Sequence, residues 1–272
     1  MVSQEQRRRQ LAREKFLRQQ QRRTSARRRN QTRNAVIAAV VGVLVAGGAT
    51  AYATGLFKSD DKKASAAGAT PSATPTSKAP DPCEKPAEGA VKSLTWKKEP
   101  AVTIDTSAAY SMKIATTCGD IGIALKASAA PHTVNSFAFL AGKGYFDHTK
   151  CHRLTTNGIY VLQCGDPTGQ GSGGPGYTIP DENLKDKTLK GNVYPAGTIA
   201  MANTGQKHTG GSQFFLVYQD SQLPPSYTPF GTISTSGMTV LKKIAAAGES
   251  TGQGDGAPNA TVVVNKLTVT KS

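Results

Sequence analysis

Chemically versatile side chains gather in one short part of the sequence. Cys151, His152 and Arg153 are consecutive, and Gln163 and Cys164 follow after the nine residues LTTNGIYVL. Two cysteines and a histidine could hold a metal ion, but no paired C-x-x-C or H-x-x-x-H spacing accompanies them, so we expect no metal site. An arginine stays charged and donates hydrogen bonds in several directions from a planar group. The residues alone leave Arg153 as either such a donor in a site or an ordinary surface arginine on a strand.

The cysteines also have a structural use. The chain contains four of them, Cys83, Cys118, Cys151 and Cys164. In an exported protein, four cysteines permit up to two disulfides with three full connectivities, and the sequence does not choose among these. If Cys151 and Cys164 lie on paired strands, alternation places Cys164 on the opposite side from Gln163. A bridge between the two cysteines would then require a bulge near Gly165.

Several common catalytic signatures are absent from the sequence. It contains no G-x-x-x-x-G-K-[ST] loop, no G-x-S-x-G elbow and no H-E-x-x-H helix. Nucleotide, acyl-transfer and zinc-protease chemistries therefore lack their usual residues, and no cofactor is implied.

The elements that must position these residues are mainly short strands. After Trp96 the sequence has short alternating apolar runs separated by Gly, Asn and Pro, which predict strands. The predicted strands cover residues 112–115, 121–125, 159–163, 198–202, 213–218, 229–233 and 261–269. Helical spacing occurs in two stretches, Pro131 to Leu140 and Met238 to Ala247. The pattern favours a mostly antiparallel, closed sheet with two helices against it.

The N-terminal part has a different composition. Residues 35–57 form an uncharged, largely apolar stretch that, at ~1.5 Å rise per residue, would cross the ~30 Å hydrocarbon layer. Arginines crowd its N-terminal side, so the positive-inside rule places residues 1–34 in the cytoplasm and the later residues outside, as a single-pass protein of the cell membrane. The alternative is a signal peptide, because Ala51-Tyr52-Ala53 resembles a cleavage site. Cleavage near Ala53 would release the domain.

The net charge of +15 belongs mainly to the tail. Residues 1–33 hold twelve Arg and Lys against Glu5 and Glu14, about +10, which leaves about +5 for the rest of the chain. The tail could bind nucleic acid through residues 7–29, with an affinity that falls steeply with salt. A topogenic signal that also attracts anionic lipid is favoured, and we expect no nucleic-acid partner.

Residues 58–95 separate this N-terminal part from the predicted strands. They are rich in Ala, Ser, Thr, Pro and Lys and contain few apolar side chains. Such a composition predicts an extended linker ahead of a folded domain at residues 96–272.

Four stretches of the sequence resemble successive signatures of the cyclophilins. They are APHTVNSFAFLAGKGYFDHTKCHRL, VLQCGDPTGQGSGGPGYTIPDENL, GTIAMANTGQKHTGGSQFFLVY and TPFGTI. They occur in the family's order and at compatible spacings, and the resemblance runs from about Met112 to the C-terminus. It implies a closed eight-stranded antiparallel β-barrel capped by two α-helices. The apolar stretch at residues 35–57 adds a single transmembrane helix ahead of this fold. It also implies the family's activity, the cis/trans isomerisation of X-Pro bonds.

The resemblance assigns roles to individual residues. Arg153 matches the family's catalytic donor, and Gln163 matches the glutamine that orients the arginine and binds the substrate backbone. The remaining substrate-binding residues that the resemblance implies are Tyr160, Val161, Ala202, Asn203, Gln213, Phe215, Leu223 and Tyr227. By strand alternation, Phe214 is expected in the core and His152 is expected to be an inward-facing, hydrogen-bonded residue.

The chain departs from the family pattern in three places. The segment between Arg153 and Gln163 is longer than usual, which affects where Tyr160 lies. The family's histidine near the pocket appears here as Tyr227. Where many eukaryotic members carry a tryptophan important for cyclosporin binding, the aligned residue is Gln222, so we expect weak cyclosporin binding with activity retained.

Together these observations predict a monomeric peptidyl-prolyl isomerase attached to the membrane through residues 35–57. Its substrates would be proline-containing exported or cell-surface polypeptides, whose folding it would assist. A second possible function uses the same groove without catalysis, as a chaperone or scaffold for proline-containing chains. That binding function would survive loss of Arg153 but not loss of Phe215.

Overall fold

The computed structural model describes residues 80–272. The predicted tail at 1–34, the predicted membrane span at 35–57 and the predicted linker as far as residue 79 lie outside these residues. No helix within the described residues is long and apolar enough to cross a membrane. The transmembrane helix of the predicted fold therefore has no counterpart in the described structure.

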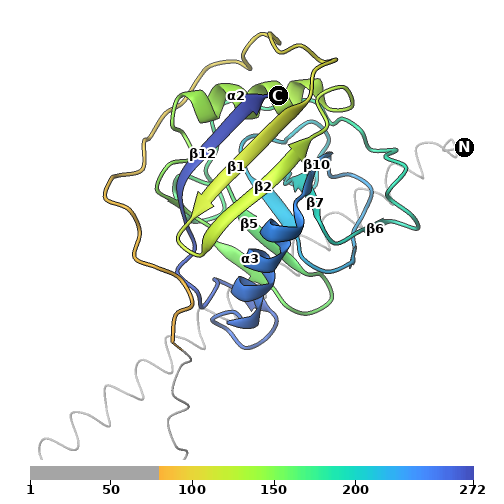
Figure 1. The fold of residues 1–272 in the computed structure, drawn as a ribbon. Helices are drawn as coiled ribbons and strands as arrows, with labels where there is room; N and C mark the ends of the chain where they lie inside the picture. The colour runs from red at the N-terminus through yellow and green to blue at the C-terminus, as the bar shows by residue number, and fades with distance from the viewer. Residues whose placement is uncertain (1–79) are drawn as a thin grey trace, which may run out of the picture. The chain divides into compact units, whose positions relative to one another are not determined.

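The described residues are mainly β-structure (Figure 1). The strands are β1 (Tyr110–Thr116), β2 (Gly119–Leu125), β3 (Thr149–Lys150), β4 (Arg153–Thr155), β5 (Val161–Cys164), β6 (Val193–Tyr194), β7 (Thr198–Met201), β8 (Phe214–Val217), β9 (Ser221–Gln222), β10 (Pro229–Ile233), β11 (Asp255–Gly256) and β12 (Val263–Lys271). Ten of them form one sheet in the order β11-β4-β5-β8-β7-β10-β2-β1-β12-β3, and β6 and β9 form a separate pair. The pairings between these strands are antiparallel.

The sheet corrects the prediction of a closed eight-stranded barrel, because its ladder has ten strands and ends at β11 and β3. The backbone changes partner between Cys151 and His152. The Cys151 amide donates to the Val262 carbonyl (3.0 Å), whereas the His152 amide donates to the Gln163 carbonyl (3.1 Å). Residues 149–155 thereby form two short strands, β3, which pairs with β12, and β4, which pairs with β5. β11 then adds an edge strand beyond β4.

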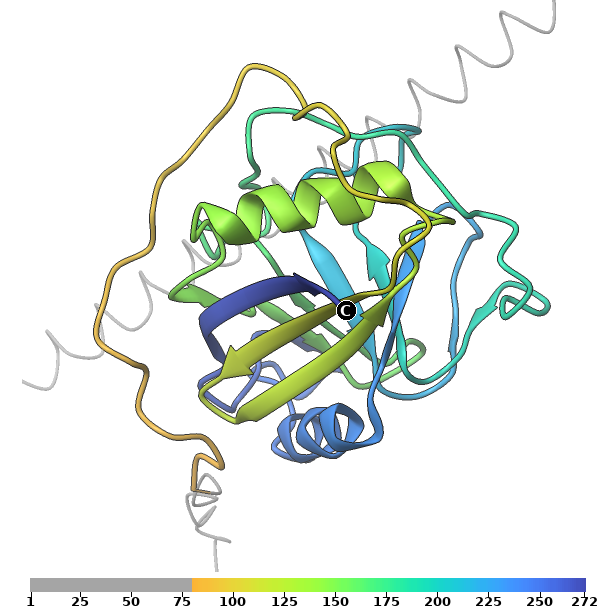
Figure 2. The same cartoon turned by 45° about the horizontal axis from the view of Figure 1, so that its top comes forward.

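Two helices in the described residues pack on the sheet. α2 (Pro131–Gly142) has proline in its first turn and buries an apolar stripe that includes Phe137. α2 packs against β12 and α3 (Thr235–Ala246) packs against β2, and Figure 2 shows them on opposite sides of the layer formed by β1, β2 and β12. α3 begins before the predicted helix because Ser234 caps it, its hydroxyl accepting a hydrogen bond from the Gly237 amide (3.1 Å).

Alternation along the strands gives the sheet two apolar faces. The inner face holds the main core, in which Phe214 lies 5.5 Å from Phe137 between ring centroids. The outer face carries a smaller cluster that includes Val161, Tyr194 and Phe215. The prediction that Phe214 belongs to the core is confirmed, and its neighbour Phe215 lies on the other side.

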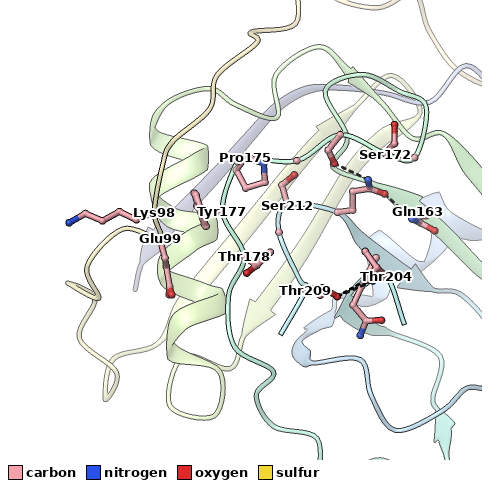
Figure 3. Close-up of a pocket in the computed structure, with 18 of the residues that line it drawn as sticks. Lys98, Glu99, Gln163, Ser172, Pro175, Tyr177, Thr178, Thr204, Thr209 and Ser212 are labelled. Atoms are coloured by element: carbon pink, nitrogen blue, oxygen red, sulfur yellow. Dashed lines mark hydrogen bonds between the residues drawn. The ribbon is translucent and has the colours of Figure 1, made fainter. Parts of the chain in front are cut away.

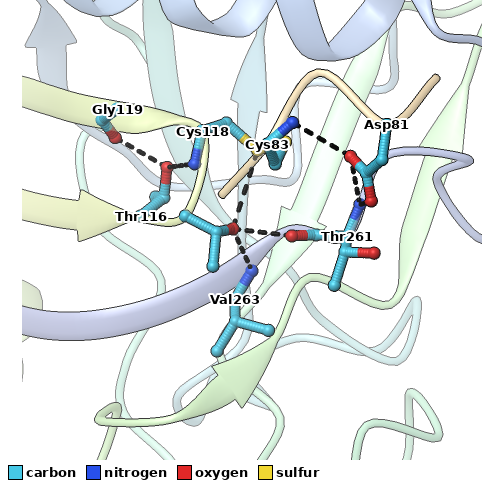
Figure 4. The surroundings of a disulfide bond; sticks show 8 residues. Asp81, Cys83, Thr116, Cys118, Gly119, Thr261 and Val263 are labelled. Atoms are coloured by element: carbon cyan, nitrogen blue, oxygen red, sulfur yellow. Dashed lines mark hydrogen bonds between the residues drawn. A yellow bond between two sulfur atoms is a disulfide. The ribbon is translucent and has the colours of Figure 1, made fainter. Parts of the chain in front are cut away.

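The first described residues, 80–95, are attached to the sheet although the sequence assigns them to the linker. Figure 4 shows the disulfide between Cys83 and Cys118, which lies in the turn between β1 and β2. The Asp81 carboxylate accepts a hydrogen bond from the Thr261 amide (3.0 Å), just before β12. The disulfide and this hydrogen bond therefore attach residues 80–95 to strands that contribute to the main core.

The second disulfide joins Cys151 to Cys164, and both residues are buried in the main core. The bridge does not need the bulge expected near Gly165. The irregularity lies instead at Cys151 and His152, where the chain passes from β3 to β4 and Cys151 turns inward to meet Cys164. Each sulfur is bonded to the other, and residues 80–272 contain no His, Cys, Asp and Glu cluster that could hold a metal ion.

Candidate active site

Cross-strand pairing places three of the predicted site residues in one row. Arg153 on β4 lies opposite Gln163 on β5, and Gln163 lies opposite Phe215 on β8. Directly opposed residues of antiparallel strands project from the same face of a sheet. The three side chains therefore emerge together on the outer face, away from the main core.

The polar members of this row are connected by hydrogen bonds of defined direction. Arg153 Nη1 donates to Gln163 Oε1 (3.3 Å), and Gln163 Nε2 donates to Gln213 Oε1 (3.0 Å). Gln213 Nε2 then donates to the Gly173 carbonyl (2.9 Å). Because each glutamine accepts at one atom and donates at the other, the chain of bonds fixes both amide orientations.

On its other side Arg153 is paired with Asp255 of β11. Arg153 Nε lies 2.7 Å from Asp255 Oδ1, and Arg153 Nη2 lies 2.7 Å from Asp255 Oδ2, which is a bidentate arrangement. The hydrogen bond from Arg153 lowers the pKa of Asp255, and the Asp255 carboxylate in turn raises the pKa of Arg153. Both groups are therefore charged near neutral pH. Arg153 is also the only arginine of the sequence after residue 33.

A pocket of about 520 Å³ opens beside the row. Its apolar wall is formed by Val161, Phe215, Leu223 and Tyr227, and Arg153 lies at the polar side. The remaining lining residues are His152, Ile159, Gln163, Gln170, Gly171, Ala202, Asn203, Gly256 and Ala257. The rings of Phe215 and Tyr227 meet edge to face with centroids 5.3 Å apart. The pocket can hold an apolar ring next to a charged hydrogen-bond donor.

The β6–β9 pair supports the apolar wall of this pocket. The Tyr194 hydroxyl donates to the Tyr227 carbonyl (2.8 Å), and the Leu223 amide donates to the Asn192 carbonyl (3.0 Å). Burial raises the pKa of Tyr194 to about 12, so its hydroxyl keeps the proton that it donates. The Asn203 side chain donates to the Ser226 carbonyl (2.8 Å) and ties the neighbouring segment to the same loop.

A second pocket of about 1060 Å³ continues from the first, and Figure 3 shows its lining. Gln163, Gly171, Ala202 and Asn203 line both pockets, while Gln213 lines the second. The Ala202 amide donates a hydrogen bond to the Gln213 carbonyl (2.9 Å). The two pockets therefore form one groove that could accept an extended chain on either side of a ring.

The loop between the pockets is shaped by Asp166, whose side chain is buried within it. Its carboxylate accepts hydrogen bonds from the amides of Thr168 (2.7 Å) and Ser172 (2.9 Å). Burial alone would raise the pKa of Asp166, but hydrogen bonds from Gly173 and Thr168 lower it below its usual value. A Cβ at Gly173 would collide with Asp166 Oδ1, so glycine is required where the loop carbonyl meets Gln213.

The structure does not bring every predicted site residue to the first pocket. Tyr160 is turned away from it, with its ring packed against Tyr218 at 5.9 Å between centroids, and Ile159 lines the pocket in its place. The most informative residue that the sequence did not indicate is Asp255. It lies 102 positions from its partner Arg153, and no local pattern marks the pair.

His152 lies at the edge of the first pocket rather than in a hydrogen-bonded position. Its Nδ1 and Nε2 atoms are buried and have no hydrogen-bond partner among the described residues, which corrects the expected hydrogen-bonded histidine. Burial is the main cause that lowers the pKa of His152. The charge of Asp166 opposes this shift, and the charge of Arg153 acts in the same direction as burial. The ring is therefore neutral at neutral pH.

Comparison with known proteins identifies the family. Residues 111–269 match the family model described as cyclophilin type peptidyl-prolyl cis-trans isomerase/CLD. The chain is 51% identical over 168 residues to the probable peptidyl-prolyl cis-trans isomerase B of Mycobacterium leprae (strain TN), covering 59% of this chain and 57% of that protein. The corresponding protein of Mycobacterium tuberculosis (strain ATCC 25618 / H37Rv) is 46% identical over 186 residues, covering 65% and 60%. The chain thus matches less than two thirds of the length of these relatives.

A solved structure shows the same fold. The crystal structure of a Cryptosporidium parvum cyclophilin type peptidyl-prolyl cis-trans isomerase superposes with a TM-score of 0.50 at 26% sequence identity, covering 60% of this chain and 99% of that one. The row formed by Arg153, Gln163 and Phe215 falls within the residues that match the family model, which cover more than half of the chain. The resemblance seen in the four sequence stretches is confirmed, and the protein belongs to the cyclophilin-type peptidyl-prolyl cis–trans isomerase family.

Proposed function

We propose that the protein catalyses the cis–trans isomerisation of X-Pro bonds, with Arg153 as the catalytic donor and the first pocket as the proline site. One observation carries this proposal. In a chain of the cyclophilin family, a charged arginine stands at the rim of an apolar pocket and is hydrogen-bonded to Gln163 on the same face.

The reaction makes limited demands on the protein. Rotation about a peptide bond must disrupt amide resonance, with a barrier of ~18–20 kcal/mol, but no covalent bond is formed or broken. A catalyst needs a donor that interacts with the twisting amide more strongly in the transition state than in the planar ground state. It also needs a surface that holds the proline ring while the attached chain rotates.

The outer-face groove supplies both parts. Phe215, Leu223 and Tyr227 form an apolar surface for the ring. Arg153 borders the same pocket, and its planar group can donate to the proline nitrogen as that atom becomes pyramidal and gains electron density. Gln163, held between Arg153 and Gln213, orients this donor and faces the substrate backbone.

We also propose that the domain acts on exported polypeptides outside the cytoplasm. Two disulfides occur in the described residues, and structural disulfides persist mainly in oxidising compartments. Slow X-Pro isomerisation can limit folding, so an isomerase located there would assist the folding of exported chains. Export is tested by locating the domain with a membrane-impermeant label on intact cells. Labelling only after lysis would contradict it.

The activity is tested by measuring cis–trans exchange of a short proline peptide with the full-length chain. Uncatalysed exchange takes ~10–100 s at 25 °C, so acceleration is readily measured. We expect catalytic amounts of the protein to accelerate exchange, and the same peptide with alanine in place of proline to compete weakly. If the protein binds the proline peptide but leaves the exchange rate unchanged, the groove has the binding function and the catalytic proposal fails.

A further inference from the structure

We propose that Asp255 is a positioning residue for catalysis, because it holds the Arg153 guanidinium in the orientation that presents free donors to the proline pocket. This inference rests on the proposed isomerase activity. It starts from the bidentate pair, in which both carboxylate oxygens of Asp255 lie 2.7 Å from nitrogen atoms of Arg153. No other acidic side chain in the described residues is paired with Arg153.

The sheet register places Asp255 where it can reach this side chain. Asp255 on β11 lies opposite Thr155 of β4, and Thr155 is two residues after Arg153 on the same strand. Residues two apart on a strand share a face, so Asp255 and Arg153 are diagonal neighbours on the outer face. The Asp255 carboxylate therefore contacts the Arg153 guanidinium along its Nε–Nη2 edge.

The loop that carries Asp255 is itself fixed in place. The Glu249 carboxylate accepts hydrogen bonds from the amides of Thr251 (2.6 Å) and Gly254 (2.8 Å), which closes the loop on itself. The Gly254 carbonyl then accepts a hydrogen bond from the Thr156 amide (2.9 Å), which attaches the loop to the end of β4. Asp255 therefore approaches Arg153 from a rigid support.

The loop also requires glycine at position 254, where its backbone contacts Asn157. Gly254 has φ +92, a left-handed conformation that favours glycine, and a Cβ there would collide with the side chain of Asn157. This close approach brings β11 against β4. Asp255 follows Gly254 directly, so its position depends on this contact.

The donors of Arg153 can be counted. A guanidinium carries five N–H groups. Asp255 engages Nε and one N–H of Nη2, and Gln163 engages one N–H of Nη1. One N–H on each of Nη1 and Nη2 remains, and Arg153 borders the pocket. With its plane fixed from two sides, the side chain can meet a twisting amide without a prior search among rotamers.

A structural role alone does not account for the pair. Asp255 is 56% exposed and Arg153 is 37% exposed, and ion pairs of such exposure contribute little to folding stability. Asp255 has a second, opposing effect, because its charge partly offsets that of Arg153. Positioning predicts that removal of the carboxylate slows catalysis, whereas charge compensation alone predicts that removal accelerates it.

The test compares Asp255→Asn with the unsubstituted full-length protein in the proline-peptide exchange assay. The asparagine keeps the shape of the side chain but cannot accept two charge-assisted bonds. We expect kcat/KM to fall about tenfold, with the loss in kcat and KM nearly unchanged, because the ring pocket is intact. Asp255→Glu, which retains the carboxylate, should recover part of the activity.

Asp120→Asn provides the matched control. Asp120 is 58% exposed and pairs with Lys113 at 2.6 Å, away from the pocket, so its loss should leave kcat/KM unchanged. The coupling is measured by repeating Asp255→Asn in an Arg153→Lys protein. The positioning role predicts that the second substitution then has little further effect, because lysine has no planar group to orient.

Three results would overturn the inference. An increase in kcat/KM for Asp255→Asn would show that the carboxylate restrains the arginine. An equal loss from Asp255→Asn in the unsubstituted protein and in the Arg153→Lys protein would show a merely structural role. Full activity of Asp255→Asn would also contradict positioning while leaving the isomerase proposal intact.

The activity of the unsubstituted protein and the folding of each variant must also be measured, so that loss of positioning is distinguished from lack of isomerase activity and from unfolding. If the unsubstituted protein does not accelerate exchange, the positioning role and the isomerase proposal fail together. Thermal unfolding of each variant checks that it is folded, and Asp255→Ala, which also removes the carboxylate, serves as the test variant if Asp255→Asn is not folded.

Discussion

Phe214 and Phe215 are consecutive on β8 yet belong to different hydrophobic clusters. Phe214 packs on Phe137 and Phe146 inside the main core, whereas Phe215 packs against Tyr194 and Tyr227 on the outer face. One residue therefore serves the fold and its neighbour forms the proposed proline site. This division follows from strand alternation. Substitution of Phe214 should therefore affect mainly folding stability, and substitution of Phe215 should affect mainly peptide binding.

The two phenylalanines should respond differently to truncation. We expect Phe214→Ala to lower the free energy of unfolding by ~3–5 kcal/mol, because it leaves a cavity in the closed core. Phe215→Ala should cost less stability but should weaken binding of a proline peptide by at least ~1.5 kcal/mol, about tenfold in Kd. Urea unfolding and peptide titration measure the two quantities. Equal peptide affinity in Phe215→Ala would show that the ring site lies elsewhere.

The disulfide between Cys83 and Cys118 should stabilise the domain. It closes a loop with a sequence separation of 35, for which chain entropy predicts roughly 3–4 kcal/mol. We expect the double substitution Cys83→Ser and Cys118→Ser to lower the free energy of unfolding by about this amount while the folded protein keeps its activity, because the bridge is outside both pockets. Unchanged stability in urea unfolding would mean that residues 80–95 do not constrain the chain.

The neutral His152, whose ring nitrogens are buried, should make stability depend on pH. Its pKa in the folded protein is lowered, mainly by burial, whereas in the unfolded chain it is ~6.5. The unfolded state therefore binds more protons, so the contribution to stability is complete above pH ~6.5 and declines as the pH falls below that value toward the folded pKa. Urea unfolding at pH 7.5 and pH 5 should show a larger decrease for the unsubstituted protein than for His152→Asn. The same decrease in both would refute this origin.

Cyclosporin should bind weakly to this protein. Gln222 stands where many eukaryotic cyclophilins carry a tryptophan that is important for the drug, and its side chain is exposed on β9, outside both pockets. We expect Gln222→Trp to strengthen inhibition of the exchange reaction relative to the unsubstituted protein. Submicromolar inhibition of the unsubstituted protein would contradict the prediction.

The central residues of the site could be predicted because the sequence around each of them resembles the family. Arg153, Gln163 and Phe215 each fall within a stretch that resembles the family, and the cross-strand register then places them in one row. The helix at Pro131 could be predicted for a similar reason, since proline at the first position and an apolar stripe are local signals.

The features that the sequence could not predict depend on distant contacts. The change of partner between β3 and β4 follows from the hydrogen bond between the Cys151 amide and the Val262 carbonyl, and Asp255 reaches Arg153 from 102 positions away. Both of these depend on tertiary pairing rather than on local residue pattern. Tyr160 lies outside the first pocket, in the segment between Arg153 and Gln163 that is longer than the family pattern, and Ile159 lines the pocket instead.

The central claim is that Arg153 catalyses X-Pro isomerisation as a planar donor, and the most direct test is Arg153→Lys in the proline-peptide exchange assay. Lysine keeps the positive charge but lacks the planar fork. We predict that kcat/KM falls by ~10²-fold or more while the peptide Kd and the free energy of unfolding change little, with Lys113→Ala as a control that changes none of them. Retention of most of the activity by a folded Arg153→Lys protein would contradict the account.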